Sequence, residues 1–377
     1  MKHKKKVVIL GKLPPPYVGP AIATEIILNS RLKERFDLVY FDTKLNREIS
    51  GIGKLHPQKF YELPVQYLKF FKVMIKEMPS LVLVPISQSS WGFFKDGIFI
   101  LISKLFGRKV IIHLRGSNIK NWLAGAGWFI NIYFRLCMKI SNAVIVLGQK
   151  LRYLFADYFS DDKIFVVPNG GNYDIQPGEK QKPTEDDEKK VRLLYLGNLQ
   201  YSKGIKDILG ALVCLDNETI SKVTLNVVGA FRAPEDKIEI IREIINFDLP
   251  VNLFPPAGKA LKMELLSKAD IFVFPPREPE GHPWVIIEAM AAGLPIISTD
   301  QGAITESVLD GVNGFIAAPN NPEQIAEKIT MLVNDEEMRR RMGKESRRLY
   351  EENFTEDIMV ERLAKVFDEV MGEVRGQ

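Results

Sequence analysis

Two glutamates bracket an apolar segment in the last third of the chain, and both have the chemistry to hold a polar ligand. Residues 278–300 read EPEGHPWVIIEAMAAGLPIISTD, in which Glu280 precedes a Gly-His-Pro-Trp turn and Glu288 lies in the apolar run. Pro283 suits the first position of a helix, where a missing N–H costs nothing, and Gly293 suits the residue that ends it. We therefore expect Glu280 in a loop and Glu288 on the following helix, at two ends of one ligand.

The start of this helix is a candidate phosphate site. Backbone N–H groups around His282, Trp284 and Val285 have no acceptor in a helix that begins there, and the helix dipole favours an anion. A ligand with hydroxyls at both ends and phosphate in the middle matches this pattern, and a nucleotide-diphosphate sugar is such a ligand. The alternative is a charged loop followed by a helix on which Glu288 pairs with a basic neighbour.

Short β-branched runs alternate with amphipathic stretches through both halves of the chain. This alternation predicts parallel sheets with helices on both faces, in two doubly wound α/β domains. The strands expected in the first half are residues 6–10, 37–41, 81–84, 110–114, 143–147 and 164–167, and the helices are 20–34, 60–77, 91–105, 128–140 and 149–158. The strands expected in the second half are residues 191–197, 223–229, 251–254, 271–274, 294–298 and 314–318.

The expected domain limits follow from a polar, proline-containing segment between the halves. We expect an N-terminal domain over 1–172, a linker over 173–190 and a C-terminal domain over 191–355. A last helix over 356–377 is expected to cross back and pack on the N-terminal domain.

Glycines follow several of the expected strands, where ligands bind in doubly wound sheets. Neither half contains G-x-G-x-x-G or G-x-x-x-x-G-K-[ST], so a nicotinamide dehydrogenase and a P-loop NTPase are disfavoured. The chain also lacks Asp-x-Asp and any His, Cys and carboxylate cluster at metal-binding spacing, so we expect no metal and no cofactor.

The two halves of the 377-residue chain carry opposite charge. Residues 1–172 contain 26 Lys and Arg against 11 Asp and Glu, a net charge of +15, whereas residues 173–377 have a net charge of −11. The basic, aromatic stretches 60–78 and 128–140 fit docking on an anionic membrane surface, although core aromatics beside solvated lysines are as good an interpretation. No known nucleic-acid module accompanies the charge, so nucleic acid is not an expected partner.

Two cysteines and no membrane-length apolar run predict a cytoplasmic protein, peripheral at most on the inner face of the cytoplasmic membrane.

The charge asymmetry between the two halves has an alternative explanation, which is mutual attraction between the oppositely charged domains.

The segment E-G-x-x-x-x-x-x-E-A-M-A-x-G-x-P resembles the E-x7-E signature of glycosyltransferase family 4, whose members are retaining enzymes of the GT-B fold. The resemblance extends over nearly the whole chain. Its other segments are VPNGG at 167–171, LGNLQYSKGI at 196–205, SKADIFVFPP before the signature and STDQGAITESVLDGVNGFIAAPNNPEQIAEKI after it. It implies two Rossmann-like domains that face a central cleft.

The resemblance also implies a role for each matched residue. Glu280 would contact the donor sugar near the reacting centre, Glu288 the ribose hydroxyls, and Lys203 the leaving diphosphate. His113 would face the donor sugar. The remaining donor-side residues are Gly19, Asn198, Gly281, His282, Pro283, Trp284 and Glu306, and the acceptor-side residues are Arg115 and Gly116.

Several positions depart from the family pattern. Asn198 stands where an Arg usually supports Lys203, so Lys203 acts alone or with Arg277 or Arg232. Pro20 follows Gly19 in the acceptor loop, and Pro283 replaces a common Gly; each removes one N–H donor. Arg115 replaces the second His of H-x-H-G and could bind a phosphate or an anionic sugar.

The family implies transfer of a sugar from a UDP- or GDP-sugar to an acceptor hydroxyl, without a metal. We expect a lipid-linked glycan of bacterial polysaccharide, O-antigen or cell-envelope synthesis as the acceptor. A UDP-sugar epimerase of the same fold and a non-catalytic nucleotide-sugar-binding protein are the alternatives.

Overall fold

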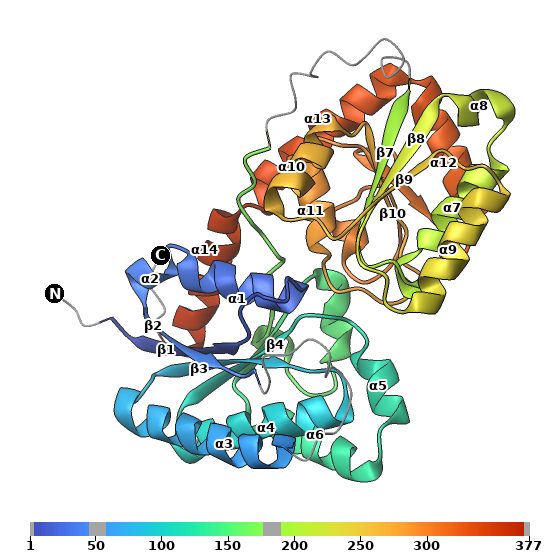
Figure 1. The fold of residues 1–377 in the computed structure, drawn as a ribbon. Coiled ribbons are helices and arrows are strands. Elements are labelled where there is room, and N and C mark those ends of the chain that lie inside the picture. Colours follow the sequence, from blue (N-terminus) through green and yellow to red (C-terminus); the bar gives the residue numbers. More distant parts are fainter. Residues whose placement is uncertain (1–3, 45–57, 176–189, 373–377) are drawn as a thin grey trace. The chain divides into compact units, whose positions relative to one another are not determined.

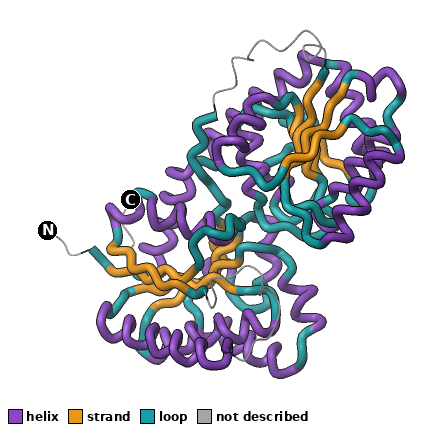
Figure 2. Tube along the Cα trace, in the orientation of Figure 1, coloured by secondary structure: helices purple, strands orange, loops and turns teal. Residues whose placement is uncertain are grey.

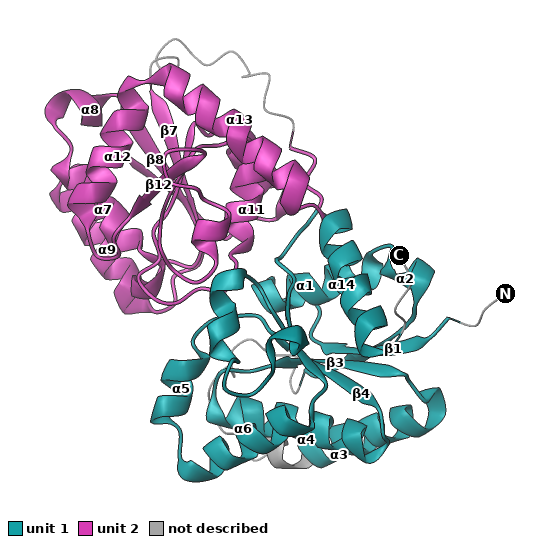
Figure 3. Ribbon diagram, turned by 180° about the vertical axis from the view of Figure 1, so that it is seen from behind, with its two compact units in different colours: residues 1–171, 356–377 teal, residues 172–355 magenta. Residues whose placement is uncertain are grey.

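The computed structural model describes residues 4–44, 58–175 and 190–372. The chain divides into two compact units, which we describe separately (Figure 3). Unit 1 comprises residues 1–171 and 356–377, and unit 2 comprises residues 172–355. Most of the expected linker, residues 176–189, lies outside the described residues.

Unit 1 is built on a six-stranded parallel sheet of order β2-β1-β3-β4-β5-β6. The strands are β1 (Lys6–Gly11), β2 (Asp37–Asp42), β3 (Leu81–Ile86), β4 (Lys109–Leu114), β5 (Ala143–Val146) and β6 (Ile164–Val166). Strands β3, β4 and β5 are almost entirely buried, as expected for apolar runs in a sheet covered on both faces. All six strands lie within two residues of their expected positions.

Helices cover both faces of this sheet (Figure 1). Helices α3, α4 and α6 lie on one face, and α1, α2 and α14 lie on the other. Helix α14 is joined to α2 and the residue before it by ion pairs of Arg35 with Asp368 and of Arg31 with Asp357. The helices are α1 (Gly19–Asn29), α2 (Leu32–Arg35), α3 (Gln58–Glu77), α4 (Ser90–Leu105), α5 (Ile119–Gly125), α6 (Trp128–Ile140) and α14 (Glu356–Val370).

Unit 2 repeats this plan, with helices around a central group of strands (Figure 2). Its six-stranded parallel sheet has the order β12-β11-β10-β7-β8-β9. Its strands are β7 (Val191–Leu196), β8 (Val223–Val228), β9 (Val251–Phe254), β10 (Ile271–Phe274), β11 (Ile296–Thr299) and β12 (Gly314–Ala317). Its helices are α7 (Ile205–Cys214), α8 (Asn217–Ser221), α9 (Pro234–Asn246), α10 (Lys259–Lys268), α11 (Trp284–Ala291), α12 (Pro322–Asn334) and α13 (Glu336–Asn353). The predicted pair of doubly wound α/β domains is confirmed.

Two of the expected helices are wrong in detail. The helix expected over 20–34 is interrupted at Ser30, whose hydroxyl donates to the Ile27 carbonyl and accepts the Leu32 N–H. These local bonds compete with the helical ladder and end α1. The helix expected over 149–158 is a short 3-10 helix, Gln149–Leu154, followed by turns. Helix α5 was not expected at all. Within the described ranges, no helix is both long enough and apolar enough to cross a membrane.

Candidate functional site

Three loops gather at the carboxyl edge of the unit 2 sheet. They follow β7, β10 and β11, which are neighbours in the sheet, so their carboxyl ends emerge side by side. Strand β7 is also the point at which the strand order reverses, with β8 on one side and β10 on the other. Ligands of doubly wound sheets bind at such a reversal.

Two glycines allow these loops to touch. A Cβ on Gly204 would lie 1.8 Å from the Pro275 carbonyl oxygen, and a Cβ on Gly302 would lie 1.7 Å from the Glu280 carbonyl oxygen. Both glycines have positive φ values, of +76° and +61°. The Arg277 N–H also donates to the Ser202 carbonyl at 3.0 Å. Only glycine satisfies both the contact and the backbone angle, so the loops are held together at these two points.

The Glu280 carboxylate lies between these loops and forms an ion pair with the Lys203 ammonium group. Lys203 is in the loop after β7 and Glu280 in the loop after β10, 77 residues apart in the sequence. Burial raises the pKa of the Glu280 carboxyl above its usual range, and the Lys203 charge lowers it. Two residues predicted to contact the sugar and the diphosphate are therefore brought together.

The Glu288 carboxylate is only 2% exposed and projects from α11. Its Oε1 forms an ion pair with Lys262, which lies on α10, while its Oε2 is buried and has no hydrogen-bond partner among the described residues. Burial raises the pKa of this carboxyl and Lys262 lowers it. A buried oxygen without a donor is costly, which is consistent with a hydroxyl donor from a ligand.

Helix α11 begins at Trp284, with Pro283 as its N-cap residue. Pro283 was expected to be the first helical residue, but it is the N-cap, one position before the helix. The amides of Trp284 and Val285 are therefore the first two helical N–H groups, and they have no intrahelical acceptor. Trp284 is buried, which fits packing at the helix start. Gly293, with φ of +70°, follows the end of the helix as expected.

The His282 side chain points into the domain and not to solvent. Its Nε2 contacts the Ser307 hydroxyl at 2.5 Å, and its ring lies 5.1 Å from the ring of Phe354. Its imidazole therefore anchors the loop. The predicted contribution of His282 to donor binding would come from its backbone.

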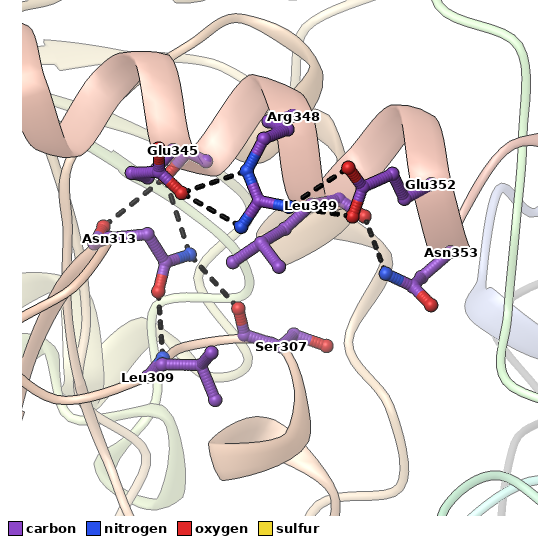
Figure 4. Close-up of polar contacts among 9 residues, drawn as sticks. Ser307, Leu309, Asn313, Glu345, Arg348, Leu349, Glu352 and Asn353 are labelled. Atoms are coloured by element: carbon purple, nitrogen blue, oxygen red, sulfur yellow. Dashed lines mark hydrogen bonds and ion pairs between the residues drawn. The ribbon is translucent and has the colours of Figure 1, made fainter.

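An asparagine behind this anchor ties the 307–309 segment to helix α13 (Figure 4). The Asn313 side chain donates to the Ser307 carbonyl at 2.9 Å and accepts the Leu309 N–H at 2.7 Å. Asn313 also exchanges hydrogen bonds with Ser346 of α13. The polar network fixes the residue that holds His282, and through it the loop that carries Glu280.

Arg277, considered above as a phosphate-binding partner of Lys203, forms an ion pair within the protein instead. Its guanidinium forms a two-pronged ion pair with Asp207, whose side chain is fully buried, and lies 4.1 Å over the Tyr201 ring. Arg232 is exposed in the loop after β8, and its guanidinium forms no hydrogen bond or ion pair with another described side chain. A bridge between Leu199 and Phe231 joins its loop to the loop of Lys203. Of the two arginines, Arg232 is the one available to assist Lys203.

Arg277→Leu is expected to destabilise the protein by about 3–5 kcal/mol, because it leaves the Asp207 charge buried without a partner. Chemical denaturation followed by circular dichroism measures the change. Arg232→Leu is the matched control and should alter stability by less than about 0.5 kcal/mol. Equal effects of the two substitutions would contradict a structural role for Arg277.

Two other predicted donor-side residues lie near this edge. Asn198 is exposed two residues after the end of β7, and its carbonyl accepts from the Tyr195 hydroxyl at 2.9 Å. Glu306 lies in the short 3-10 helix Ile304–Glu306 that follows β11. Gly281 accepts the Ala303 N–H at 2.9 Å and so joins the signature loop to this segment.

The remaining predicted residues lie at the carboxyl edge of unit 1. Gly19 begins α1, His113 is buried in β4, and Arg115 and Gly116 follow β4. Arg115 donates to the Pro20 carbonyl and to the Thr24 hydroxyl at 2.8 Å, both in α1. Burial and the Arg115 charge lower the pKa of His113 well below its usual range, so its imidazole is neutral at pH 7.

Sequence reasoning missed two residues of the unit 2 edge. Lys262 lies three residues before Leu265 and four before Leu266, and both leucines are buried. This spacing places the lysine on the same face of α10 as the leucines, which could have indicated a buried partner for it. Gly302 could not be recognised from the sequence. Glycine is required at this position by a contact with the Glu280 loop, which lies about twenty residues earlier in the chain.

Comparison with known proteins gives a match over most of unit 2. Residues 177–349 match the sequence model of the family described as glycosyl transferases group 1. The capsular polysaccharide biosynthesis glycosyltransferase CapM of Staphylococcus aureus is 24% identical over 322 residues, which cover 82% of each chain. A Campylobacter jejuni enzyme, N,N'-diacetylbacillosaminyl-diphospho-undecaprenol alpha-1,3-N-acetylgalactosaminyltransferase, is 33% identical over 190 residues, which cover 50% of this chain and 47% of that one.

The fold is shared with solved structures over nearly the full length. HepE of Anabaena, solved in complex with UDP-glucose, superposes with a TM-score of 0.73 at 17% identity and covers 97% of this chain and 100% of that one. Residues 177–349 thus carry the sequence pattern of group 1 glycosyltransferases, and the chain has the two-domain GT-B fold.

Proposed function

We propose that this protein is a retaining glycosyltransferase of family 4, which moves a sugar from a nucleotide-diphosphate sugar to an acceptor hydroxyl. One observation carries the proposal: the Lys203–Glu280 pair and the unsatisfied Glu288 oxygen lie at the two ends of one loop-and-helix segment. The E-x7-E spacing and the match to group 1 glycosyltransferases support the same conclusion.

In this proposal each group of the segment contacts one part of the donor. Glu288 accepts hydrogen bonds from the ribose hydroxyls, and the first amides of α11 bind the diphosphate. Glu280 binds hydroxyls of the sugar, and Lys203 neutralises the charge that develops on the leaving diphosphate. These fixed positive groups take the place of a metal ion.

The reaction exchanges two bonds on one face of the sugar. The bond from the anomeric carbon to the phosphate oxygen breaks as the bond to the acceptor oxygen forms. The acceptor proton passes to the leaving phosphate oxygen, so neither glutamate acts as a nucleophile. Retention then differs from the double displacement of a retaining glycosidase, which needs a carboxylate nucleophile.

A thermal-shift screen with UDP-, GDP- and ADP-sugars tests donor binding, because a bound ligand raises the melting temperature by mass action. We expect one nucleotide class to stabilise the protein, and Glu288→Ala to lose most of that shift. Glu264→Ala, which removes an exposed carboxylate of α10, is the control and should keep it. No shift with any nucleotide sugar would contradict the proposal.

Two alternatives give different products from the donor alone. A UDP-sugar epimerase would convert the donor sugar without an acceptor, and a non-catalytic binding protein would leave the donor intact. A glycosyltransferase releases nucleoside diphosphate and needs an acceptor for full turnover. NMR of the donor after incubation separates the three, and the anomeric proton coupling of the product tests retention.

We propose a lipid-linked glycan as the acceptor, on an anionic membrane surface. The Campylobacter jejuni relative is named for a diphospho-undecaprenol acceptor, which is consistent with this class. The outer surface of α3 and α6 combines exposed apolar side chains with lysines and arginine, as interfacial helices do. The apolar residues are Val65, Leu68, Phe71, Ile75, Trp128, Phe129, Ile132 and Leu136, and the basic ones are Lys69, Lys72, Lys76, Arg135 and Lys139.

Helices α3 and α6 are compatible with both interpretations of the aromatic stretches, namely packing in the core and docking on a membrane. Phe70 and Met74 of α3 and Phe134 of α6 are buried in the core, whereas Leu68 is 63% and Trp128 76% exposed. The exposed residues of α3 recur every three or four positions and so form a separate stripe on the solvent side.

Replacing both Lys69 and Lys72 by Gln should weaken binding to anionic vesicles by about tenfold or more, since each lysine near such a surface contributes about 1 kcal/mol. Flotation with vesicles of zwitterionic lipid, with and without anionic lipid, measures this. The double replacement of Lys222 and Lys268, which pair with Glu218 and Glu264 in unit 2, is the control. Wild-type protein that does not float in a salt-sensitive manner would remove the membrane from the proposal.

A further inference from the structure

Four buried polar atoms without hydrogen-bond partners cluster at the carboxyl edge of the unit 1 sheet. They are Gln88 Oε1, His113 Nε2, Arg115 Nη2 and Ser117 Oγ, and none has a partner among the described residues. We call these four residues the Arg115 cluster. A buried polar atom without a partner costs free energy, so four in one place are consistent with a ligand that supplies the partners.

The fold makes the cluster contiguous. Strands β3 and β4 pair in parallel with Pro85 opposite His113, so the loops that follow them lie side by side. Gly116 approaches Gln88 so closely that a Cβ would lie 2.1 Å from the Gln88 Nε2. The Arg115 Nε donates to the His113 Nδ1 at 3.5 Å, which links these two residues, and Ser117 follows Gly116 directly in the chain.

The cluster carries a positive charge without a counter-ion. Among the described residues, the Arg115 side chain forms hydrogen bonds with neutral groups alone, namely the Pro20 carbonyl, the Thr24 hydroxyl and the His113 ring. No described Asp or Glu lies within ion-pair distance of its guanidinium, in contrast to Arg277 with Asp207. Burial lowers the pKa of Arg115 to about 10, so it stays charged at neutral pH. Arg115 is partly buried, with its Nη2 atom fully buried, and a cation in such a place is stabilised when a ligand supplies the opposite charge.

The donors and acceptors of the cluster define the ligand. Because His113 Nδ1 accepts from Arg115, its Nε2 carries the ring proton and donates. With Arg115 Nη2 and Ser117 Oγ the cluster offers three donors, and Gln88 Oε1 adds one acceptor beside them. Three donors around a positive charge suit an anionic oxygen group, and the acceptor suits a neighbouring hydroxyl.

We propose that the Arg115 cluster binds an anionic oxygen group, a carboxylate or a phosphate, on a hydroxylated substrate. The inference rests on the proposed function, for which it names the class of substrate bound by unit 1. Such a substrate is a sugar acid or a phosphorylated sugar or carrier. Pro20 offers no N–H in the first turn of α1, so the charge comes from the Arg115 side chain.

Isothermal titration of the full chain with D-glucuronate, D-glucose and inorganic phosphate tests the proposal. We expect glucuronate or phosphate to bind wild-type protein, and Arg115→Gln to weaken that binding by about tenfold or more, as for loss of a charged hydrogen bond. Arg115→Lys should retain part of the affinity. Glucose should bind more weakly than glucuronate, because it lacks the charge.

The outcomes distinguish the two sources of the anion. Binding of glucuronate alone indicates a carboxylated sugar, and binding of phosphate alone indicates a phosphorylated substrate. Lys206→Met, which removes a cation that pairs with Glu239 outside either proposed site, is the control and should leave glucuronate binding unchanged. No binding by either anion, or equal binding to wild type and Arg115→Gln, overturns the proposal.

Two further measurements keep the result interpretable. Ser117→Ala removes one donor and no charge, so it serves if Arg115→Gln does not fold, and it should weaken the same anion by a smaller factor. UDP, GDP and ADP titrated into the same samples report on donor binding separately. Failure of UDP, GDP and ADP all to bind counts against the proposed function, whereas failure of the anions alone counts against this inference.

Discussion

Glu280→Gln is expected to lower kcat by about 100-fold or more, with little change in the melting temperature. Glutamine keeps the size of the side chain and removes its charge, so the substitution abolishes the ion pair with Lys203 and weakens contacts with the sugar hydroxyls near the reacting centre. Release of nucleoside diphosphate in the presence of acceptor measures kcat.

The neighbouring Glu278 provides a matched control for this experiment. It lies two residues earlier in the same loop and is exposed, so Glu278→Gln removes the same charge without touching Lys203. It should leave kcat within about twofold of wild type. Near-wild-type turnover of Glu280→Gln, or equal losses in both variants, would exclude a role for Glu280 at the reacting centre.

Lys203→Met should cause the second large loss, again of about 100-fold in kcat, because it removes the cation nearest to the leaving diphosphate. It should also change the pH dependence. The Lys203 charge lowers the pKa of Glu280 while burial raises it, so removing Lys203 raises that pKa further. The acidic limb of the pH–rate profile should therefore move to higher pH in the variant.

Lys206→Met is the control for this second prediction. Lys206 lies three residues after Lys203 but pairs with Glu239, which is largely exposed. Its removal should alter neither kcat nor the acidic limb. A Lys203→Met variant with reduced kcat and an unshifted limb would show that Lys203 does not set the ionisation of Glu280.

Much of the fold could be predicted from the sequence because buried parallel strands have a strong local signature. Runs such as IFVF at 271–274 are wholly apolar and β-branched or aromatic, and the structure places them at the centre of each sheet. The helix ends were less predictable. The break at Ser30 depends on two hydrogen bonds of one hydroxyl, which compete with a pattern that otherwise continues.

From the residues alone, candidate site residues could be grouped only where they share one segment, whereas Lys203 was added by the family resemblance. Glu280 and Glu288 are separated by seven residues, so the sequence places them without knowledge of the fold. Lys262 and Arg277 show the limit of that reasoning. The pairing of Lys262 with Glu288, and the commitment of Arg277 to Asp207, depend on which helices pack together. The sequence alone does not show which of the basic residues near the site already form ion pairs with carboxylates of the protein.

The central claim is that one ligand extends from Glu280 to Glu288. Its sugar lies at Glu280, its diphosphate at Lys203 and the start of α11, and its ribose at Glu288. Titration of the nucleoside diphosphate identified by the screen, and of the corresponding nucleoside, into wild type, Lys203→Met and Glu288→Ala tests it directly. The account predicts that Glu288→Ala weakens both ligands, whereas Lys203→Met weakens the diphosphate alone. Equal loss of both ligands in Lys203→Met, or unchanged nucleoside binding in Glu288→Ala, would contradict it.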